Sequence, residues 1–280
     1  MMTTQTAQVP LDLPPIGSRS RRELLLAEAR ALDQSFADLQ VLVDRVASEF
    51  ASNQCASFTR YDPMGRAEGL YRLPERLFAG IVDRVAMELS PTDRPLVLHV
   101  DELREFYFRW KPHASRVPFT CVDLAERLLS EFEPRALDLA HQQAAHMFAR
   151  VFGLKHQKPR KVVAGCMVLE HGASVDAIWS PARYGPHAKE NIREHLEALA
   201  TCLPFADPSV DRVVIRREVE EVLQELERRS WVPERDFRGV VAGVQIRLFQ
   251  TAVKYHFPLA HVEALNLFCV QHAPDYFAGR

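Results

Sequence analysis

Apolar side chains recur at three- and four-residue spacing through the first half of the chain. The longest stripe runs from Leu24 to Phe50 and predicts a helix of about thirty residues, longer than a lone globular helix needs. We expect this helix to pair with a second long helix, as a helical hairpin, because Asp33 and Asp38 interrupt any long coiled-coil seam. Shorter stripes predict helices over 74–89, 101–110, 120–132 and 135–153. Residues 53–72 are predicted to break the helical pattern.

The periodicity changes after Gly153. The run KVVAGCMVL, residues 161–169, is short, apolar and β-branched, and it predicts a strand. Helices are predicted over 189–202, with His195 on the apolar face, and over 210–229.

Two alternating segments near the end of the chain predict a β-hairpin. Val244–Phe249 and Val253–Phe257 flank the turn Gln250-Thr251-Ala252, and their apolar residues fall on matching faces. A last helix follows Pro258, and the sequence shows no obvious internal repeat.

These elements predict an α+β, predominantly helical fold, in which a helical N-terminal part precedes a mixed part with a small antiparallel sheet or hairpin. We expect three regions: a flexible arm over 1–18, a mainly helical region over 19–154 and an α+β region over 155–280. A chain of 280 residues is long enough to bury a sizeable core without disulfides or structural metal.

Composition and charge are those of a soluble globular protein. The chain is 47% hydrophobic and 26% charged, and 35 basic against 37 acidic residues give a net charge of −2. No global field therefore draws the molecule to nucleic acid or an anionic membrane, and any such contact must be local. The five cysteines form no C-x-x-C pair, and neither a secretory signal nor a membrane-spanning run is present, so a cytoplasmic location is expected.

A local basic segment stands out against this neutral background. Residues 155–161, KHQKPRK, carry four fixed positive charges and no acid. They complement the dipole of the preceding helix, or they contact phosphates, and both interpretations stay open. The hairpin adds further basic side chains at its polar positions. The candidate nucleic-acid-binding residues are Lys155, Lys158, Arg160, Lys161, Arg247, Lys254 and His256.

Searches for catalytic or metal-binding motifs give little. The histidines form no H-E-x-x-H pattern, and no nucleophile elbow, P-loop or dinucleotide fingerprint is present, so we expect neither a metal nor a cofactor. Arg135 and His141 have the loose spacing of certain helical ribonucleases and are the only catalytic candidates. The alternative is that both are ordinary surface residues of a helix.

From about Thr120 onward the order of elements resembles the family known as domain of unknown function 4942. The resemblance rests on residues 123–152 (DLAERLLSEFEPRALDLAHQQAAHMFARVF), the strand KVVAGCMVL and residues 243–277 (GVQIRLFQTAVKYHFPLAHVEALNLFCVQHAPDYF). The chain departs from the family in lacking a tryptophan in GLKHQKPRK and a Gly or Asn in the hairpin turn. The resemblance implies an accessory protein of plasmids, prophages or integrative elements, and no established activity.

Three hypotheses follow. The first is a non-enzymatic mobile-element protein that binds a macromolecule, either DNA or RNA or a host defence or regulatory protein. The second is a nucleic-acid-processing enzyme, such as a metal-independent ribonuclease. The third is a structural or adaptor protein that dimerises through the helix around residues 20–50.

Overall fold

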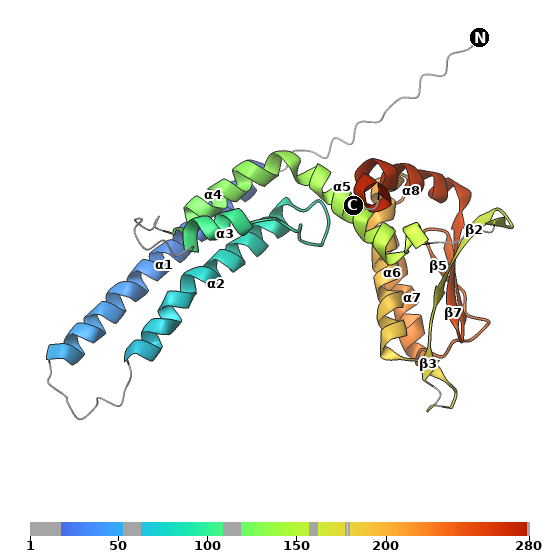
Figure 1. Cartoon of the computed structure of the whole chain (residues 1–280), viewed down its shortest axis with the longest axis horizontal. Coiled ribbons are helices and arrows are strands. Elements are labelled where there is room, and N and C mark those ends of the chain that lie inside the picture. Colours follow the sequence, from blue (N-terminus) through green and yellow to red (C-terminus); the bar gives the residue numbers. More distant parts are fainter. Residues whose placement is uncertain are drawn as a thin grey trace, which may run out of the picture. The chain divides into compact units, whose positions relative to one another are not determined.

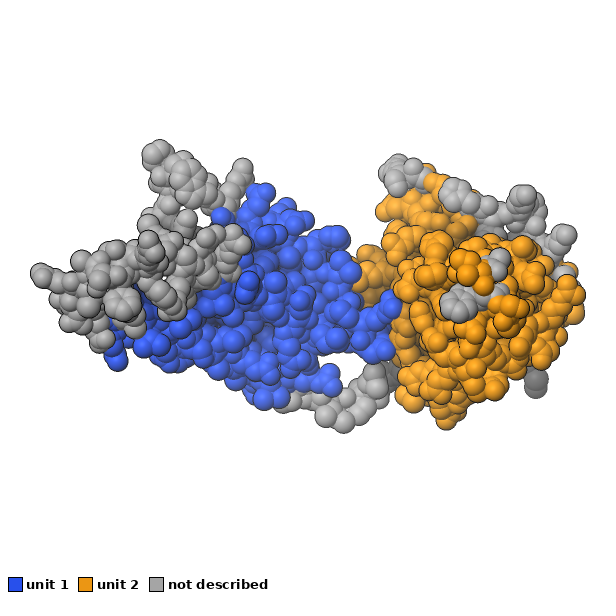
Figure 2. Space-filling model, turned by 90° about the horizontal axis from the view of Figure 1, so that it is seen from below, with its two compact units in different colours: residues 1–136 blue, residues 137–280 orange. Residues whose placement is uncertain are grey.

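The computed structural model describes residues 18–52, 63–108, 119–156, 162–176, 178 and 180–278. The chain consists of two compact units, unit 1 (residues 1–136) and unit 2 (residues 137–280), shown in blue and orange in Figure 2. The described part of unit 1 is helical, whereas unit 2 combines helices with an antiparallel sheet. The predicted α+β, predominantly helical fold class is therefore confirmed. The expected flexible arm lies outside the described residues apart from Ser18.

Unit 1 is built around a long helical pair (Figure 1). Its elements are α1 (Ser18–Ser52), α2 (Pro63–Leu89), α3 (Asp101–Phe108), α4 (Cys121–Phe132) and the short 3₁₀ helix η2 (Glu133–Arg135). α1 and α2 lie against each other, as the hairpin interpretation predicts, and α4 packs on both. The core contains apolar residues from all three helices: Leu25, Ala29, Ile81, Val85, Leu124 and Leu128.

Helix α2 is longer than the sequence pattern indicates. We expected the helix to begin at Pro74 after a break over 53–72, but it begins at Pro63 and contains Pro74. The expectation is wrong for residues 63–72, and residues 53–62 lie outside the described part. A proline inside a helix removes one backbone hydrogen bond, and here that loss does not end the helix.

The second half of the α1 stripe is uncovered. Leu39 and Leu42 are 37% and 52% exposed, although their spacing places them on the same stripe as buried Leu25. The described residues of unit 1 therefore bury only the first part of this apolar face.

Unit 2 places helices on one face of a five-stranded sheet. Its helices are α5 (Ala136–Val151), η3 (Leu154–His156), α6 (Pro186–Ala206), α7 (Arg212–Arg228), α8 (Leu259–His272) and α9 (Pro274–Ala278). Its strands are β1 (Val162–Val163), β2 (Cys166–Gly172), β3 (Val175–Asp176), β4 (Arg183–Tyr184), β5 (Gly239–Val241), β6 (Val244–Phe249) and β7 (Ala252–Pro258). Although we grouped α5 with the helical region over 19–154, its residues Ala144, Ala145 and Phe148 belong to the core of unit 2.

The main sheet has the order β1-β2-β7-β6-β5, and every neighbouring pair is antiparallel. The predicted hairpin is confirmed: Ile246 lies opposite Tyr255, and Leu248 lies opposite Val253, with all four side chains buried. These side chains face α5, α6, α7 and α8, which lie together on one side of the sheet in Figure 1.

The predicted strand over 161–169 is instead a second hairpin. Ala164 and Gly165 have φ values of 50° and 74°, so they form a two-residue turn of the I′ kind between β1 and β2. The sequence Val-Val-Ala-Gly recurs at 240–243, and Ala242 and Gly243 make the same turn, with φ values of 46° and 79°. These two turns were not predicted, because Ala-Gly is a weaker hairpin signal than Asn-Gly.

Candidate functional site

One face of the main sheet carries polar and charged side chains. The strands alternate, so that residues between the buried positions of β2, β6 and β7 face away from the helices. No described helix of unit 2 covers this side, which we call the open face. Its members are Cys166, Val168, Glu170, Gln245, Arg247, Phe249, Lys254 and His256.

The register brings the three basic residues of the predicted hairpin together on the open face. Lys254 lies opposite Arg247 on β6 and opposite Glu170 on β2. His256, the next outward residue of β7, lies opposite Gln245 and Val168. The candidates Arg247, Lys254 and His256 therefore form one cluster, because a strand places alternate residues on the same face.

Contacts within the open face leave a local excess of positive charge. Lys254 Nζ lies 3.0 Å from Glu170 Oε2 and 5.1 Å from the centre of the Phe249 ring. Arg247 Nη2 donates to Gln245 Oε1 at 3.4 Å, while its Nε is buried and has no hydrogen-bond partner within the described ranges. A neutral amide and one carboxylate thus face two permanent cations.

His256 is held neutral at neutral pH by its surroundings. Burial lowers the pKa of its imidazole, and the charges of Arg247 and Lys254 lower it further. Its Nε2 is buried, and no described residue forms a hydrogen bond with it. An anion bound on the open face would offset the two neighbouring cations and favour the protonated ring.

Only part of the basic segment 155–161 is described. Lys155 lies in η3 and is exposed, whereas Lys158, Arg160 and Lys161 lie outside the described residues. The segment joins η3 to β1, the edge strand next to β2.

The two catalytic candidates belong to different units and have separate partners. Arg135 Nη2 donates to Glu131 Oε1 at 2.8 Å, and its guanidinium lies 4.7 Å from the centre of the Phe132 ring. His141 packs against other rings of unit 2, namely Phe205, Phe268 and His272, with the His272 ring centre 4.9 Å away. Burial, followed by the charge of His272, lowers the pKa of His141. An Arg135–His141 active site stays a prediction.

A second histidine cluster lies on the helical side of the sheet. His171, near the end of β2, and His195, on α6, have ring centres 4.2 Å apart. His195 stacks on Tyr255 at 5.1 Å with an interplanar angle of 17°, and Phe152 meets the His195 ring edge-on at 4.7 Å. His195 is 6% exposed, so this cluster is largely inside the core.

The two imidazoles border a polar cavity of about 380 Å³. Its lining consists of Arg150, Val151, His171, Gly172, Asn191, Glu194 and His195. His195 Nδ1 contacts the backbone oxygen of Asn191, while the Nε2 atoms of His171 and His195 are buried and find no hydrogen-bond partner in the part of the chain that the structure describes. Burial, followed by the charge of His171, lowers the pKa of His195 to about 4, and burial lowers the pKa of His171. Both rings are therefore neutral at neutral pH.

The sequence did not predict that these two histidines meet. The apolar pattern places His195 on the apolar face of its helix. Side chains alternate along a strand, so His171 lies on the same side of β2 as Met167 and Leu169, toward the core. Their meeting depends on how α6 packs on β2, which no local pattern specifies.

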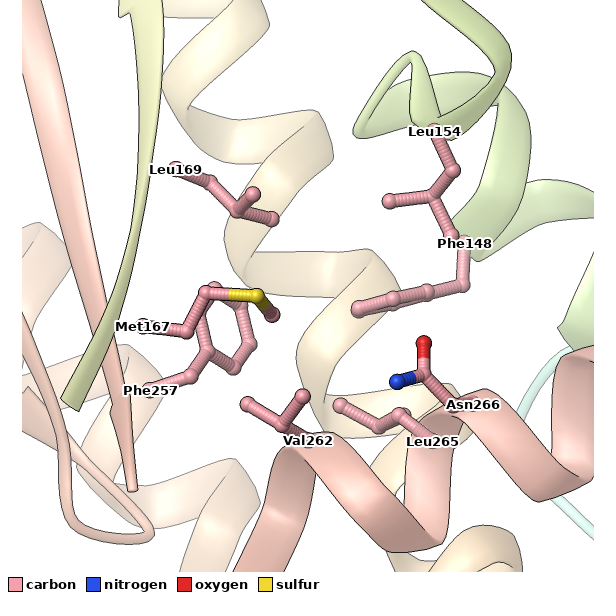
Figure 3. A pocket seen from close by; sticks show the side chains of 8 residues that line it. All are labelled: Phe148, Leu154, Met167, Leu169, Phe257, Val262, Leu265 and Asn266. Atoms are coloured by element: carbon pink, nitrogen blue, oxygen red, sulfur yellow. The ribbon is translucent and has the colours of Figure 1, made fainter. Parts of the chain in front are cut away.

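A second hollow in unit 2 is apolar and small (Figure 3). Side chains from α5, η3, β2, β7 and α8 converge on it: Phe148, Leu154, Met167, Leu169, Phe257, Val262, Leu265 and Asn266. Its volume of about 10 Å³ is close to that of one water-sized sphere, and Asn266 is its single polar lining residue. We interpret it as a packing gap of the core.

No family model matches the chain, and neither a curated protein nor a solved structure shows significant similarity to it. The resemblance to domain of unknown function 4942 therefore stays a prediction. Among the described residues, no helix is long and apolar enough to cross a membrane.

Proposed function

We propose that the protein binds nucleic acid through the open face of unit 2. The observation that carries this proposal is the cluster of Arg247, Lys254 and His256 on a sheet face that no described helix of unit 2 covers. Guanidinium and ammonium groups are the usual partners of phosphate oxygens, and Gln245 adds an amide beside them.

The size of the cluster sets the kind of binding expected. Two permanent cations and one conditional cation neutralise few phosphates, so the open face supplies modest, salt-dependent affinity with little base selectivity. Phe249 and His256 offer ring faces on which unstacked bases pack, which favours a single strand over a duplex. The basic segment 155–161 is expected to add phosphate contacts, since its chain continues into β1 of the same sheet.

The test compares an open-face variant with a matched surface variant. We expect Arg247→Gln/Lys254→Gln to bind a fluorescent single-stranded oligonucleotide about tenfold more weakly than the native chain, measured by anisotropy. The slope of log affinity against log salt should fall by about 2, or about 1 for each lost phosphate contact. The control is Arg217→Gln/Arg228→Gln, which removes the same two positive charges, because these side chains are 68% and 70% exposed on α7, away from the open face.

Unchanged affinity and salt slope in the double variant would refute the proposal. Equal losses in the open-face variant and in the charge-matched α7 variant would refute it as well, because they indicate net charge rather than a site. A native chain that binds no oligonucleotide but copurifies with a stoichiometric host protein would favour the protein-partner hypothesis. A mobile-element setting rests on the family resemblance alone.

A further inference from the structure

We propose that His171 and His195 form a binding site for a divalent transition-metal ion such as Zn²⁺, bound through their two Nε2 atoms. The site is distinct from the open face, since His171 and His195 lie on the helical side of the sheet.

The first step of the argument is the tautomer of His195. Its Nδ1 contacts the backbone oxygen of Asn191, which only accepts hydrogen bonds, so Nδ1 carries the proton. Nε2 is then left with a free lone pair. Histidine ligands of metals are commonly oriented in this way, with the other ring nitrogen donating to a backbone carbonyl.

The second step is the state of the two Nε2 atoms. Both are shielded from solvent, and neither has a hydrogen-bond partner among the described residues. A buried polar atom without a partner is unfavourable, and here two such atoms belong to rings whose centres are 4.2 Å apart. A single cation between the rings would satisfy both lone pairs.

The third step is the charge of the cavity wall. The cavity wall balances one cation, Arg150, with one carboxylate, Glu194.

The remaining coordination positions are left to water and to oxygen atoms of the cavity wall, such as Glu194 and Asn191. No three His, Cys, Asp or Glu side chains of the described residues are arranged to hold a metal ion, so the site has only two histidine ligands. Binding is therefore expected to be reversible and weaker than at a four-ligand structural zinc site. His171 is half-buried near the end of β2 and is the more accessible of the two ligands.

The test is to titrate the metal-free full chain with Zn²⁺ alone. Calorimetry measures the binding, and thermal unfolding measures the stability at each Zn²⁺ concentration. We expect one ion per chain and a rise in the unfolding temperature that grows with Zn²⁺ concentration. His171→Phe and His195→Phe should each weaken binding at least tenfold. Phenylalanine keeps an aromatic ring against Phe152 and Tyr255 while removing the nitrogen ligands.

The matched control is His141→Phe. His141 and His272 form the other close histidine pair of unit 2, with ring centres 4.9 Å apart, and this variant should bind Zn²⁺ like the native chain. The proposal is overturned if the native chain takes up no Zn²⁺, if His171→Phe binds normally, or if His141→Phe removes the binding. Circular dichroism of each metal-free variant verifies the fold. His171→Phe decides the result if His195→Phe does not fold, because His171 is less buried than His195.

Discussion

The ionisation of His256 depends on its burial and on the two cations beside it on the open face. Burial lowers the pKa of the ring, and Arg247 and Lys254, which lie on the same side of the sheet, lower it further. The imidazole therefore carries little charge at neutral pH and gains it on acidification.

This arrangement predicts a pH-dependent affinity for nucleic acid. As the pH falls below about 6.5, the protonated fraction of His256 rises, and bound phosphate raises the pKa of the ring by favouring its charged form. We expect the affinity for a single-stranded oligonucleotide to increase by up to about tenfold between neutral pH and about pH 5.

His256→Gln should remove most of this increase. His146→Gln should retain it, because His146 is an exposed residue of α5 and does not belong to the open face. Anisotropy titrations at constant ionic strength measure both variants. An undiminished pH response in His256→Gln would contradict the prediction.

Single residues also mark the limit of what the sequence predicts. Period-two alternation was enough to place Arg247, Lys254 and His256 on one face, because the hairpin register is local. The approach of His171 to His195 was not predictable, since it requires a strand and a helix to pack in three dimensions. Asp33 is a similar case: the sequence shows it as an interruption of an apolar stripe.

At the scale of elements, Asp33 of α1 caps the start of another helix. Its Oδ1 accepts from the backbone N–H of Cys121 at 2.7 Å, and its Oδ2 accepts from that of Val122 at 3.1 Å. Thr120 Oγ1 accepts from the N–H of Asp123 at 3.1 Å. A carboxylate at this end of α4 also complements the helix dipole. The contact thus fixes α4 on α1.

We predict that Asp33→Ala lowers the free energy of unfolding by about 1–2 kcal/mol, because two N–H groups at the start of α4 lose their acceptor. Asp38→Ala is the matched control on the same helix. Asp38 accepts a hydrogen bond from the exposed Gln34 one turn earlier in α1, so its loss should cost less than about 0.5 kcal/mol. Urea unfolding followed by circular dichroism compares them, and equal costs would argue against the capping role.

The type of most elements was predictable, but two boundaries were not. The Thr120 cap and the apolar periodicity correctly gave α4, α5 and the β6–β7 hairpin. The sequence predicts a strand through Ala164-Gly165 because alanine rarely adopts a positive φ, and only the tertiary structure shows that it does so here. Pro74 predicts a helix start because its ring removes a hydrogen bond, a local penalty that does not stop α2.

At the scale of the whole molecule, unit 2 has the components of an independent folding unit. Its buried cluster draws on α5, α6, α7, α8 and the main sheet, and the aromatic residues Phe152, Tyr184, Trp231 and Phe257 are each almost fully buried within it. The open face and the histidine cavity both belong to this unit.

We therefore predict that residues 136–280 fold when expressed alone. Their urea unfolding should be cooperative, with a free energy in the usual range of about 5–15 kcal/mol. Affinity for the oligonucleotide should fall no more than about threefold relative to the full chain, since all the described basic residues of the proposed site are retained. Loss of the cooperative transition would show that unit 2 depends on residues before Ala136.

The open face also carries a cysteine thiol, that of Cys166. Burial raises the pKa of the Cys121 thiol to about 12 and that of Cys202 well above its ordinary value, and Cys269 is buried too. Cys166 is the more accessible of the described thiols, and it lies two residues along β2 from Val168, the neighbour of His256. A maleimide fluorophore or a photocrosslinker is thus expected to react there first among these thiols. The native sequence thereby provides an attachment point from which ligand occupancy on this face can be followed without introducing a cysteine.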